Sequence, residues 1–203
     1  MDSSNGGMVQ KANTMVAIKP LLAQKSETTL VDGSDPSTIE NFTRIGNANW
    51  RFAEGALVGD GGTVNSFLVT KESYRDFQIR AEFWAENNTN SGIFIRCNDP
   101  ATFNSATCYE VNIYDQRPDP TYGTGAIGNV AKVSPMPKAG GRWNTFVITA
   151  KGTHLIVELN GVKTVDVNDS NHAAGTIALQ WGTLDKDVPG GGINWRTVTI
   201  RSL

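Results

Sequence analysis

The sequence predicts an all-β protein, a sandwich of two antiparallel sheets, and three observations support that class. From about Thr28 onward, short apolar runs alternate with turn residues at intervals of roughly 8 to 15 residues, the spacing of sandwiches and barrels. Several runs alternate apolar and polar residues with the period of two that a half-buried strand requires. No long helical pattern interrupts them, and 203 residues fit one large domain of this class.

The chain divides into an N-terminal segment and one domain. Residues 1–27 are rich in small and polar side chains and show no sustained period, so we expect a flexible tail. Residues 28–203 are expected to form a single domain that buries a substantial core. The start of the chain lacks the apolar segment of a signal peptide. No segment approaches the roughly 20 consecutive apolar residues of a membrane-spanning helix, so we expect a soluble chain without a membrane partner.

Composition excludes some classes of ligand. The formal net charge is -2 and no basic run is present, which argues against binding to nucleic acid or to an anionic membrane. The chain has two histidines and two cysteines, and their spacing does not match a zinc site. A neutral or weakly charged ligand is therefore expected, with no metal site among these residues.

The first strongly alternating segment is residues 76–86, DFQIRAEFWAE. Its apolar face includes Phe77 and Phe83, and its opposite face carries Glu82 and Trp84. If this strand joins the sheet that holds the ligand, it adds a carboxylate and an indole to the polar face.

Two further runs, residues 91–97 (SGIFIRC) and 108–115 (CYEVNIYD), have the same alternation. We expect them to pair as a hairpin across residues 98–107. Arg96 and Glu110 would then lie on one polar face, and Phe94 falls on the same parity as Arg96. A face with an arginine, a carboxylate, an amide and aromatic rings suits a polar, ring-shaped ligand.

The remaining strands close the predicted sandwich. Residues 143–152, 153–159 and 162–167 read as a meander, in which Asn160-Gly161 is a type I′ hairpin signal. Residues 176–182 and 193–203 follow, and we expect the last strand to pair with an early one.

Hairpin pairing would bring Cys97 and Cys108 to neighbouring strand ends. Cys97 shares the parity of Ile95, whereas Cys108 shares the parity of Glu110, which counts against a bridge unless a bulge intervenes. Both a disulfide and two free thiols therefore remain open.

Seven segments, in order, resemble the 3-keto-disaccharide hydrolase domain family, long known only as a domain of unknown function. The resemblance covers about Trp50 to Leu203, most of the expected domain. Two departures from the family pattern stand out: Gly128 follows the TGAI segment where tyrosine is frequent, and Trp181-Gly182-Thr183 follows Leu-Gln where the family commonly has histidine. The segments are NSGIFIR, CYEVNIYD, TGAI, GRWNTFVITAKG, LNGV, IALQ and WRTVTIRSL.

The resemblance implies a concanavalin A-like jelly roll with a ligand groove on its concave sheet. It also implies hydrolysis of glycosides that are oxidised to a ketone at C3. Family members are often exported from bacteria, so the resemblance implies a periplasmic or secreted protein whose signal is absent from this sequence.

Three residues are the predicted catalytic groups for such a reaction. A ketone at C3 acidifies the hydrogen on C2, so that a base can start elimination of the C1 substituent and water can then add. Glu110 is our expected base. Arg96 is expected to hold the developing enolate oxygen and to lower the pKa of Glu110. Glu82 is the expected acid, provided that its strand joins the same sheet.

Flanking side chains are the expected substrate contacts. Trp84 offers an aromatic platform for the apolar face of a pyranose, whereas Trp143, Trp181 and Trp195 are expected in the core. The two histidines, His154 and His172, are expected at the surface, and Asp115 is expected to cap a turn. The full set of expected substrate contacts is Asn112, Tyr114, Gln180, Trp84 and Phe94.

Other interpretations stay open. Arg96 and Glu110 can be a cross-strand ion pair without substrate, and Glu82 can be a surface charge. A carboxylate pair in a groove would also serve ordinary glycoside hydrolysis. A non-catalytic carbohydrate-binding module, or a purely structural sandwich, would use the same fold. We expect a monomer that uses no cofactor, and a calcium ion at a loop carboxylate stays open.

Overall fold

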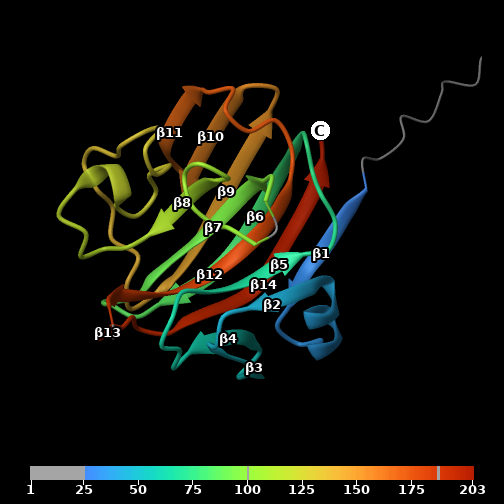
Figure 1. The fold of residues 1–203 in the computed structure, drawn as a ribbon, viewed down its shortest axis with the longest axis vertical. Helices are drawn as coiled ribbons and strands as arrows, with labels where there is room; N and C mark the ends of the chain where they lie inside the picture. The colour runs from blue at the N-terminus through green and yellow to red at the C-terminus, as the bar shows by residue number, and fades with distance from the viewer. Residues whose placement is uncertain (1–25, 100, 187) are drawn as a thin grey trace, which may run out of the picture.

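The computed structural model describes residues 26–99, 101–186 and 188–203, which form two antiparallel β-sheets stacked face to face (Figure 1). In order of pairing, the eight-stranded sheet contains β11 (Val162–Asn168), β10 (His154–Leu159), β9 (Trp143–Lys151), β6 (Phe77–Ala85), β14 (Ile193–Ser202), β4 (Ala56–Asp60) and β3 (Asn49–Ala53), with β1 (Glu27–Asp32) also beside β14. The six-stranded sheet contains β2 (Phe42–Ile45), β5 (Ser66–Thr70), β12 (Thr176–Asp185), β7 (Asn90–Cys97) and β8 (Tyr109–Ile113), with β13 (Val188–Pro189) beside β12. The prediction of an all-β sandwich is confirmed.

Short segments outside the sheets complete the described chain. Two 3-10 helices, η1 (Pro36–Asn41) and η2 (Pro120–Tyr122), lie in connections. The predicted tail, residues 1–27, lies almost entirely outside the described residues, and β1 starts at Glu27. Within the described residues, no helix has the length and apolarity needed to cross a membrane.

The core lies between the two sheets because the period-two alternation turns one face of each strand inward. Phe83 of β6 stacks on Phe146 of β9 with 5.0 Å between ring centroids. Trp181 and Trp195 are fully buried, as predicted. The prediction for Trp143 is wrong: its side chain is 39% exposed, because it lies on the outer parity of β9 at the start of the strand.

Two predicted connections are confirmed. Asn160 and Gly161 both have positive φ, 53° and 79°, as the tight hairpin between β10 and β11 requires. The last strand, β14, pairs with β1, β4 and β6, so the C-terminal strand does join early ones and lies between β6 and β4 inside the eight-stranded sheet.

A β-bulge in β7 changes the direction of its last side chains. Thr176 of β12 pairs with Cys97 and Ala178 pairs with Phe94, so β7 has one extra residue between these two pairs. Arg96, with a φ of 52°, is in the left-handed region at this point. Past the bulge, Cys97 lies on the outer face beside Phe94 and Cys108. The two cysteines form a disulfide, so the structure resolves the alternative in favour of the bridge.

Candidate functional site

A cavity of about 280 Å³ opens on the outer face of the six-stranded sheet. We call it the Glu110 cavity. Its floor is formed by strands β7, β8 and β12, and its walls come from two segments, residues 101–107 and 114–129. The lining residues are Asn65, Asn90, Phe94, Phe103, Asn104, Ser105, Glu110, Asn112, Tyr114, Arg117, Tyr122, Gly128, Asn129 and Gln180.

A glycine opens the centre of the floor. Gly92 of β7 pairs with Gln180 of β12 on one side and with Asn112 of β8 on the other. Residues directly opposite each other in antiparallel strands share a face, so the two amides stand on either side of a position without a side chain. A Cβ at residue 92 would lie 2.9 Å from the Val111 carbonyl oxygen and 3.6 Å from Gln180 Oε1. The missing side chain therefore creates part of the cavity.

The next row along the strands carries the carboxylate. Phe94 of β7 pairs with Glu110 of β8 and with the small Ala178 of β12. The Phe94 ring packs edge-on against Phe67, with 5.4 Å between centroids. Glu110 is thus held at mid-strand beside an apolar ring, with its side chain directed outward into the cavity.

Burial raises the pKa of Glu110 from 4.5 to about 7. The nearby Asn112 amide and the positive charge of Arg117 oppose this rise only partly. A carboxyl group with such a pKa changes protonation state near neutral pH, which suits it to move a proton to or from a substrate.

Two buried polar atoms of the cavity lack partners. Asn112 Nδ2 and Gln180 Oε1 form no hydrogen bond of ordinary geometry with the described residues. Asn112 Nδ2 is near enough to the Glu110 carboxylate to lower its pKa, but it is not well aligned with it. Leaving a buried polar atom unpaired is unfavourable by about 1–3 kcal/mol, so such atoms are usually satisfied by water or ligand. One of these atoms donates and the other accepts, and they flank the gap above Gly92.

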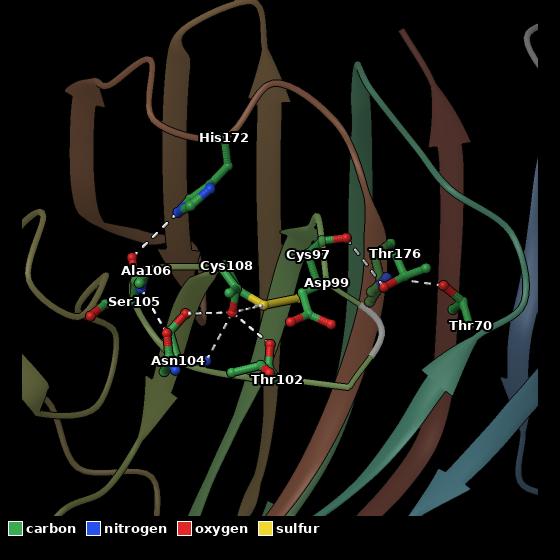
Figure 2. Close-up of a disulfide and its surroundings, with 12 residues drawn as sticks. Thr70, Cys97, Asp99, Thr102, Asn104, Ser105, Ala106, Cys108, His172 and Thr176 are labelled. Carbon is green, nitrogen blue, oxygen red and sulfur yellow. Dashed lines mark hydrogen bonds between the residues drawn. A yellow bond between two sulfur atoms is a disulfide. The ribbon is translucent and has the colours of Figure 1, made fainter.

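The first wall is the loop between β7 and β8, which the disulfide closes at its base (Figure 2). Within this loop, Thr107 Oγ1 donates to the Thr102 carbonyl oxygen at 2.6 Å. Phe103 stacks on Phe67 at 4.5 Å between centroids, which anchors the loop on the sheet. The bridge and this stacking hold Asn104 and Ser105 at the cavity.

His172 contacts the same loop, and its predicted surface position is wrong. The residue is 5% exposed, and its ring contacts Tyr109 edge-on with 4.7 Å between centroids. Its Nε2 atom lies 3.4 Å from the Ser105 carbonyl oxygen, which Figure 2 marks. His154, by contrast, is at the surface as predicted and pairs with Asp166 at 2.7 Å.

The second wall is the segment that follows β8. The Arg117 guanidinium lies over the rings of Tyr114 and Tyr122, at 5.6 and 5.2 Å from the centroids. The Tyr122 hydroxyl donates to Asn129 Oδ1, and Asn129 Nδ2 donates to Ser105 Oγ at 2.8 Å, so the two walls are connected.

The TGAI segment of this wall runs along the free edge of β8. The Gly125 N–H donates to the Asn112 carbonyl oxygen at 2.9 Å, and the Gly128 N–H donates to the Glu110 carbonyl oxygen at 3.0 Å. A Cβ at residue 128 would lie 3.3 Å from Asn112 Nδ2. Gly128 therefore leaves space beside the carboxylate and the amide.

Asp115 lies outside the cavity, and its carboxylate connects distant segments, whereas the sequence predicted a cap of the local turn. Its carboxylate accepts hydrogen bonds from the backbone N–H groups of Ala139 and Gly140, at 2.9 and 2.8 Å. It also accepts from Thr124 Oγ1 at 2.6 Å. These bonds fix the start of the second wall outside the cavity.

Arg96 does not share a face with Glu110, so that prediction is wrong. The bulge turns its side chain away from the Glu110 cavity into the protein, where its side chain is 1% exposed. Its guanidinium donates to the carbonyl oxygens of Arg75 at 2.9 Å and Gly152 at 2.7 Å, and it pairs with Asp76 at 3.2 Å. Arg96 is therefore a structural cation that makes four hydrogen bonds with its five N–H donors.

Glu82 and Trp84 lie on the opposite side of the sandwich. Both belong to β6 in the eight-stranded sheet, so the condition on which Glu82 was chosen is not met. Glu82 pairs with Arg80 at 3.3 Å and with Arg196 at 3.9 Å on the outer face of that sheet. Of the predicted site residues, the Glu110 cavity brings together Glu110, Asn112, Tyr114, Gln180 and Phe94.

Sequence reasoning missed several lining residues. Arg117, Tyr122 and Asn129 lie in a long segment without periodic alternation. The sequence pattern therefore does not predict in which direction their side chains point. Gly92 carried a signal, since an isolated glycine within a strand pattern often marks a close approach. Within the described residues, no group of three or more His, Cys, Asp or Glu side chains is placed to hold a metal ion.

The fold and the cavity define a β-sandwich domain with a polar, partly enclosed site on one sheet. The family model of the 3-keto-alpha-glucoside-1,2-lyase-like domain matches residues 26–201, so the chain belongs to that family. This is the family that the sequence segments indicated. Comparison with curated proteins finds no match.

Solved structures with a similar fold include carbohydrate-related proteins. A candidate glycosyl hydrolase from Parabacteroides distasonis ATCC 8503 is 23% identical with a TM-score of 0.63, over 79% of this chain and 100% of that chain. The carbohydrate binding module CBM66 from Bacillus subtilis is 17% identical with a TM-score of 0.61, over 80% and 96%. The exoplasmic/lumenal domain of VIP36, in its Ca²⁺/Man3GlcNAc-bound form, is 8% identical with a TM-score of 0.60, over 86% and 88%. These similarities show the fold.

Proposed function

We propose that the chain cleaves glycosides that carry a ketone at C3, by elimination across C1 and C2, with Glu110 as the base. The observation that carries this proposal is a single carboxylate, with a pKa of about 7, in a cavity that also holds an unpartnered donor and an unpartnered acceptor. Membership in the 3-keto-alpha-glucoside-1,2-lyase-like domain family supports it.

The number of carboxylates favours elimination over ordinary glycoside hydrolysis. Ordinary hydrolysis uses two carboxyl groups, one on each side of the scissile bond. Among the described residues that line the Glu110 cavity, Glu110 is the one carboxylate. A ketone at C3 removes the need for the second carboxyl group, because it acidifies the C2–H bond so that a single base can break it.

The proposed reaction has two balanced steps. The Glu110 carboxylate takes the proton from C2, and the C2–H electron pair gives an enolate on the ketone oxygen. The pair then returns to re-form the C3 ketone and to make the C1=C2 double bond, as the C1–O bond breaks with its electrons on the leaving oxygen. That leaving oxygen takes up a proton from solvent water, because in an α-glucoside it lies on the opposite ring face from the C2 hydrogen, and Glu110 returns its own proton to solvent. Water then adds its hydroxyl to C1 and a proton to C2 of the enone, and the 3-keto sugar is released.

The flanking residues have separate roles in this proposal. Asn112 Nδ2 is a free donor for the ketone oxygen as negative charge develops there. Gln180 Oε1 is a free acceptor for a sugar hydroxyl. Phe94 gives the floor an apolar ring for the C–H face of the pyranose.

The Cys97–Cys108 bridge supports an oxidising compartment outside the cytoplasm.

The test compares Glu110→Gln with Glu82→Gln on p-nitrophenyl 3-keto-α-glucoside and its unoxidised parent. Removal of a general base lowers the rate by about 10²–10⁴-fold, so E110Q should lose that much turnover while binding of the sugar changes little. E82Q, on the opposite sheet, should keep the wild-type rate. The wild-type rate should rise with pH through about 7, because the base must be deprotonated.

Deuterium at C2 of the substrate separates the mechanisms further. Elimination should show a primary isotope effect and should place solvent hydrogen at C2 of the product, whereas direct hydrolysis at C1 should show neither. Turnover by E110Q at the wild-type rate would exclude Glu110 as the base. Saccharide binding without release of p-nitrophenol from either substrate would assign the domain as a binding module instead.

A further inference from the structure

A second hollow, of about 290 Å³, lies on the outer face of the eight-stranded sheet, on the opposite side of the sandwich from the Glu110 cavity. We call it the Trp143 hollow. Two tryptophans line it, Trp84 of β6 and Trp143 of β9, and they pair directly across the two strands. The chain has five tryptophans, and the other three are 5% exposed or less. Exposing indole surface to water is unfavourable, so this pair is an unusual feature of the face.

The position of one indole is fixed by a cation. The Arg196 guanidinium stacks over the Trp143 ring at 3.7 Å from the centroid. Arg196 also lies 3.9 Å from Glu82, so its charge is balanced on the same face. An aromatic ring held in place on one side presents a preorganised surface on the other.

Polar groups with free hydrogen-bonding capacity border the indoles. Asn194 of β14 pairs with Trp84 across the strands, so its side chain stands in the same row on the same face. Glu86 follows β6 and lines the hollow beside it. Among the described residues, Glu86 forms no ion pair, and no side-chain hydrogen bond engages Glu86 or Asn194. Rings with an adjacent amide and carboxylate match the C–H face and the hydroxyls of a pyranose.

The charges favour a neutral sugar. Arg51 lines the same hollow but is paired with Asp60 at 2.8 Å, and Arg196 is engaged by Trp143 and Glu82. Two carboxylates that line the hollow, Glu86 and Glu54, form no ion pair among the described residues, so the unpaired charge is negative. An acidic sugar would be repelled by these carboxylates, whereas hydroxyl groups can donate to them.

We propose that the Trp143 hollow is a second, non-catalytic site that binds a pyranose unit of a neutral oligosaccharide. Trp84 and Trp143 form its platform, and Glu86 and Asn194 bind the hydroxyls. The hollow does not share a lining residue with the Glu110 cavity. The proposal does not depend on the reaction at Glu110.

Acrylamide quenching of tryptophan fluorescence tests the site, because the buried tryptophans contribute little to quenching. Cellohexaose, maltohexaose and xylohexaose are titrated into the wild-type protein, Trp143→Ala, Glu86→Ala and the surface control Val162→Ala, which is 66% exposed elsewhere. At least one oligosaccharide should bind the wild-type protein and V162A and protect their tryptophan fluorescence from quenching by acrylamide. W143A should weaken its binding by about tenfold or more, and E86A by severalfold, since each removes one contact of the site. Trp143 is exposed, so W143A should keep the wild-type fold by circular dichroism.

Three results would overturn the proposal. The first is that none of the three oligosaccharides binds the wild-type protein. The second is that W143A binds them as tightly as the wild type, and the third is that Glu110→Gln abolishes the binding, which would place the sugar in the Glu110 cavity. Self-association that W143A abolishes, without any saccharide binding, would assign the face to a second copy of the chain.

Discussion

Glu110 shows how the position of one residue changes its chemistry. It lines a cavity whose other groups are amides, hydroxyls and aromatic rings, with Arg117 as the cation at the rim. Burial therefore raises its pKa to about 7. Asp166, on the exposed hairpin of β10 and β11, has its pKa lowered by hydrogen bonds from Lys163 and His154. Only the first carboxyl group is suited to exchange protons near neutral pH.

The raised pKa of Glu110 predicts a pH-dependent cost to stability. Between about pH 4.5 and 7 the unfolded chain has lost this proton while the folded protein still holds it, so unfolding releases a proton and stability falls as pH rises. The shift corresponds to about 3 kcal/mol across this window. Urea unfolding should show that the free energy of unfolding of the wild type falls by about this amount from pH 5 to pH 8, relative to that of Glu110→Gln. A stability difference between the two proteins that does not change with pH would contradict the prediction.

Strand β7 combines the two local irregularities that shape the Glu110 cavity. Gly92 opens the floor between two amides, and the bulge at Arg96 sends Cys97 to the outer face. The bulge also explains why simple alternation failed from this residue on. Alternation predicts direction only where the strand has no extra residue, because each insertion exchanges the two faces.

The disulfide between β7 and β8 predicts a role in substrate binding. It closes a loop with a sequence separation of 11, and constraining a loop of this size contributes about 3 kcal/mol to stability. The double variant Cys97→Ala/Cys108→Ala should lose about that much in urea unfolding. It should also raise KM severalfold with kcat little changed, because Asn104 and Ser105 lie in the loop whereas Glu110 lies in the sheet.

Reduction of the wild type provides the control for the disulfide. Dithiothreitol should give the wild type the lower stability and the higher KM that are expected of the double variant. It should change neither quantity in the double variant itself. An unchanged KM in the double variant would show that the loop keeps its position without the bridge.

At the scale of the whole molecule, Arg96 connects the two sheets. It belongs to β7 of the six-stranded sheet, and its guanidinium bonds to Arg75 and Asp76 just before β6 and to Gly152 between β9 and β10. It also donates to the His172 carbonyl oxygen at 3.2 Å, in the connection that leads to β12. One buried cation therefore fixes one end of the sandwich.

Arg96→Met should accordingly affect stability rather than catalysis. Removing a buried ion and leaving its acceptors unpaired typically costs about 3–5 kcal/mol, which urea unfolding would measure. At a temperature where the variant is folded, kcat and the pH profile should match the wild type. A hundredfold lower kcat in fully folded R96M would restore the sequence-based prediction that Arg96 acts in the reaction.

Much of the fold was predictable because it depends on local patterns. The alternation around Ile93 and Val111 correctly predicted the hairpin, and Asn160-Gly161 correctly predicted a turn. Phe94, Glu110, Asn112 and Gln180 line one cavity, as their parity predicted, because their strands are adjacent and Phe94 precedes the bulge in β7. The second wall was not predictable in this way, since Arg117, Tyr122 and Asn129 lie in irregular backbone whose direction depends on contacts far away.

The all-β class, the family and the carboxylate at the centre of the candidate site follow from the amino-acid sequence alone. Which sheet each strand joins depends on tertiary packing, and this packing separates Glu82 and Trp84 from Glu110. It also decided the direction of Arg96 and the pairing of Cys97 with Cys108. The physical reason is that side-chain alternation is a local property of the chain, whereas sheet membership, bulges and burial depend on long-range packing.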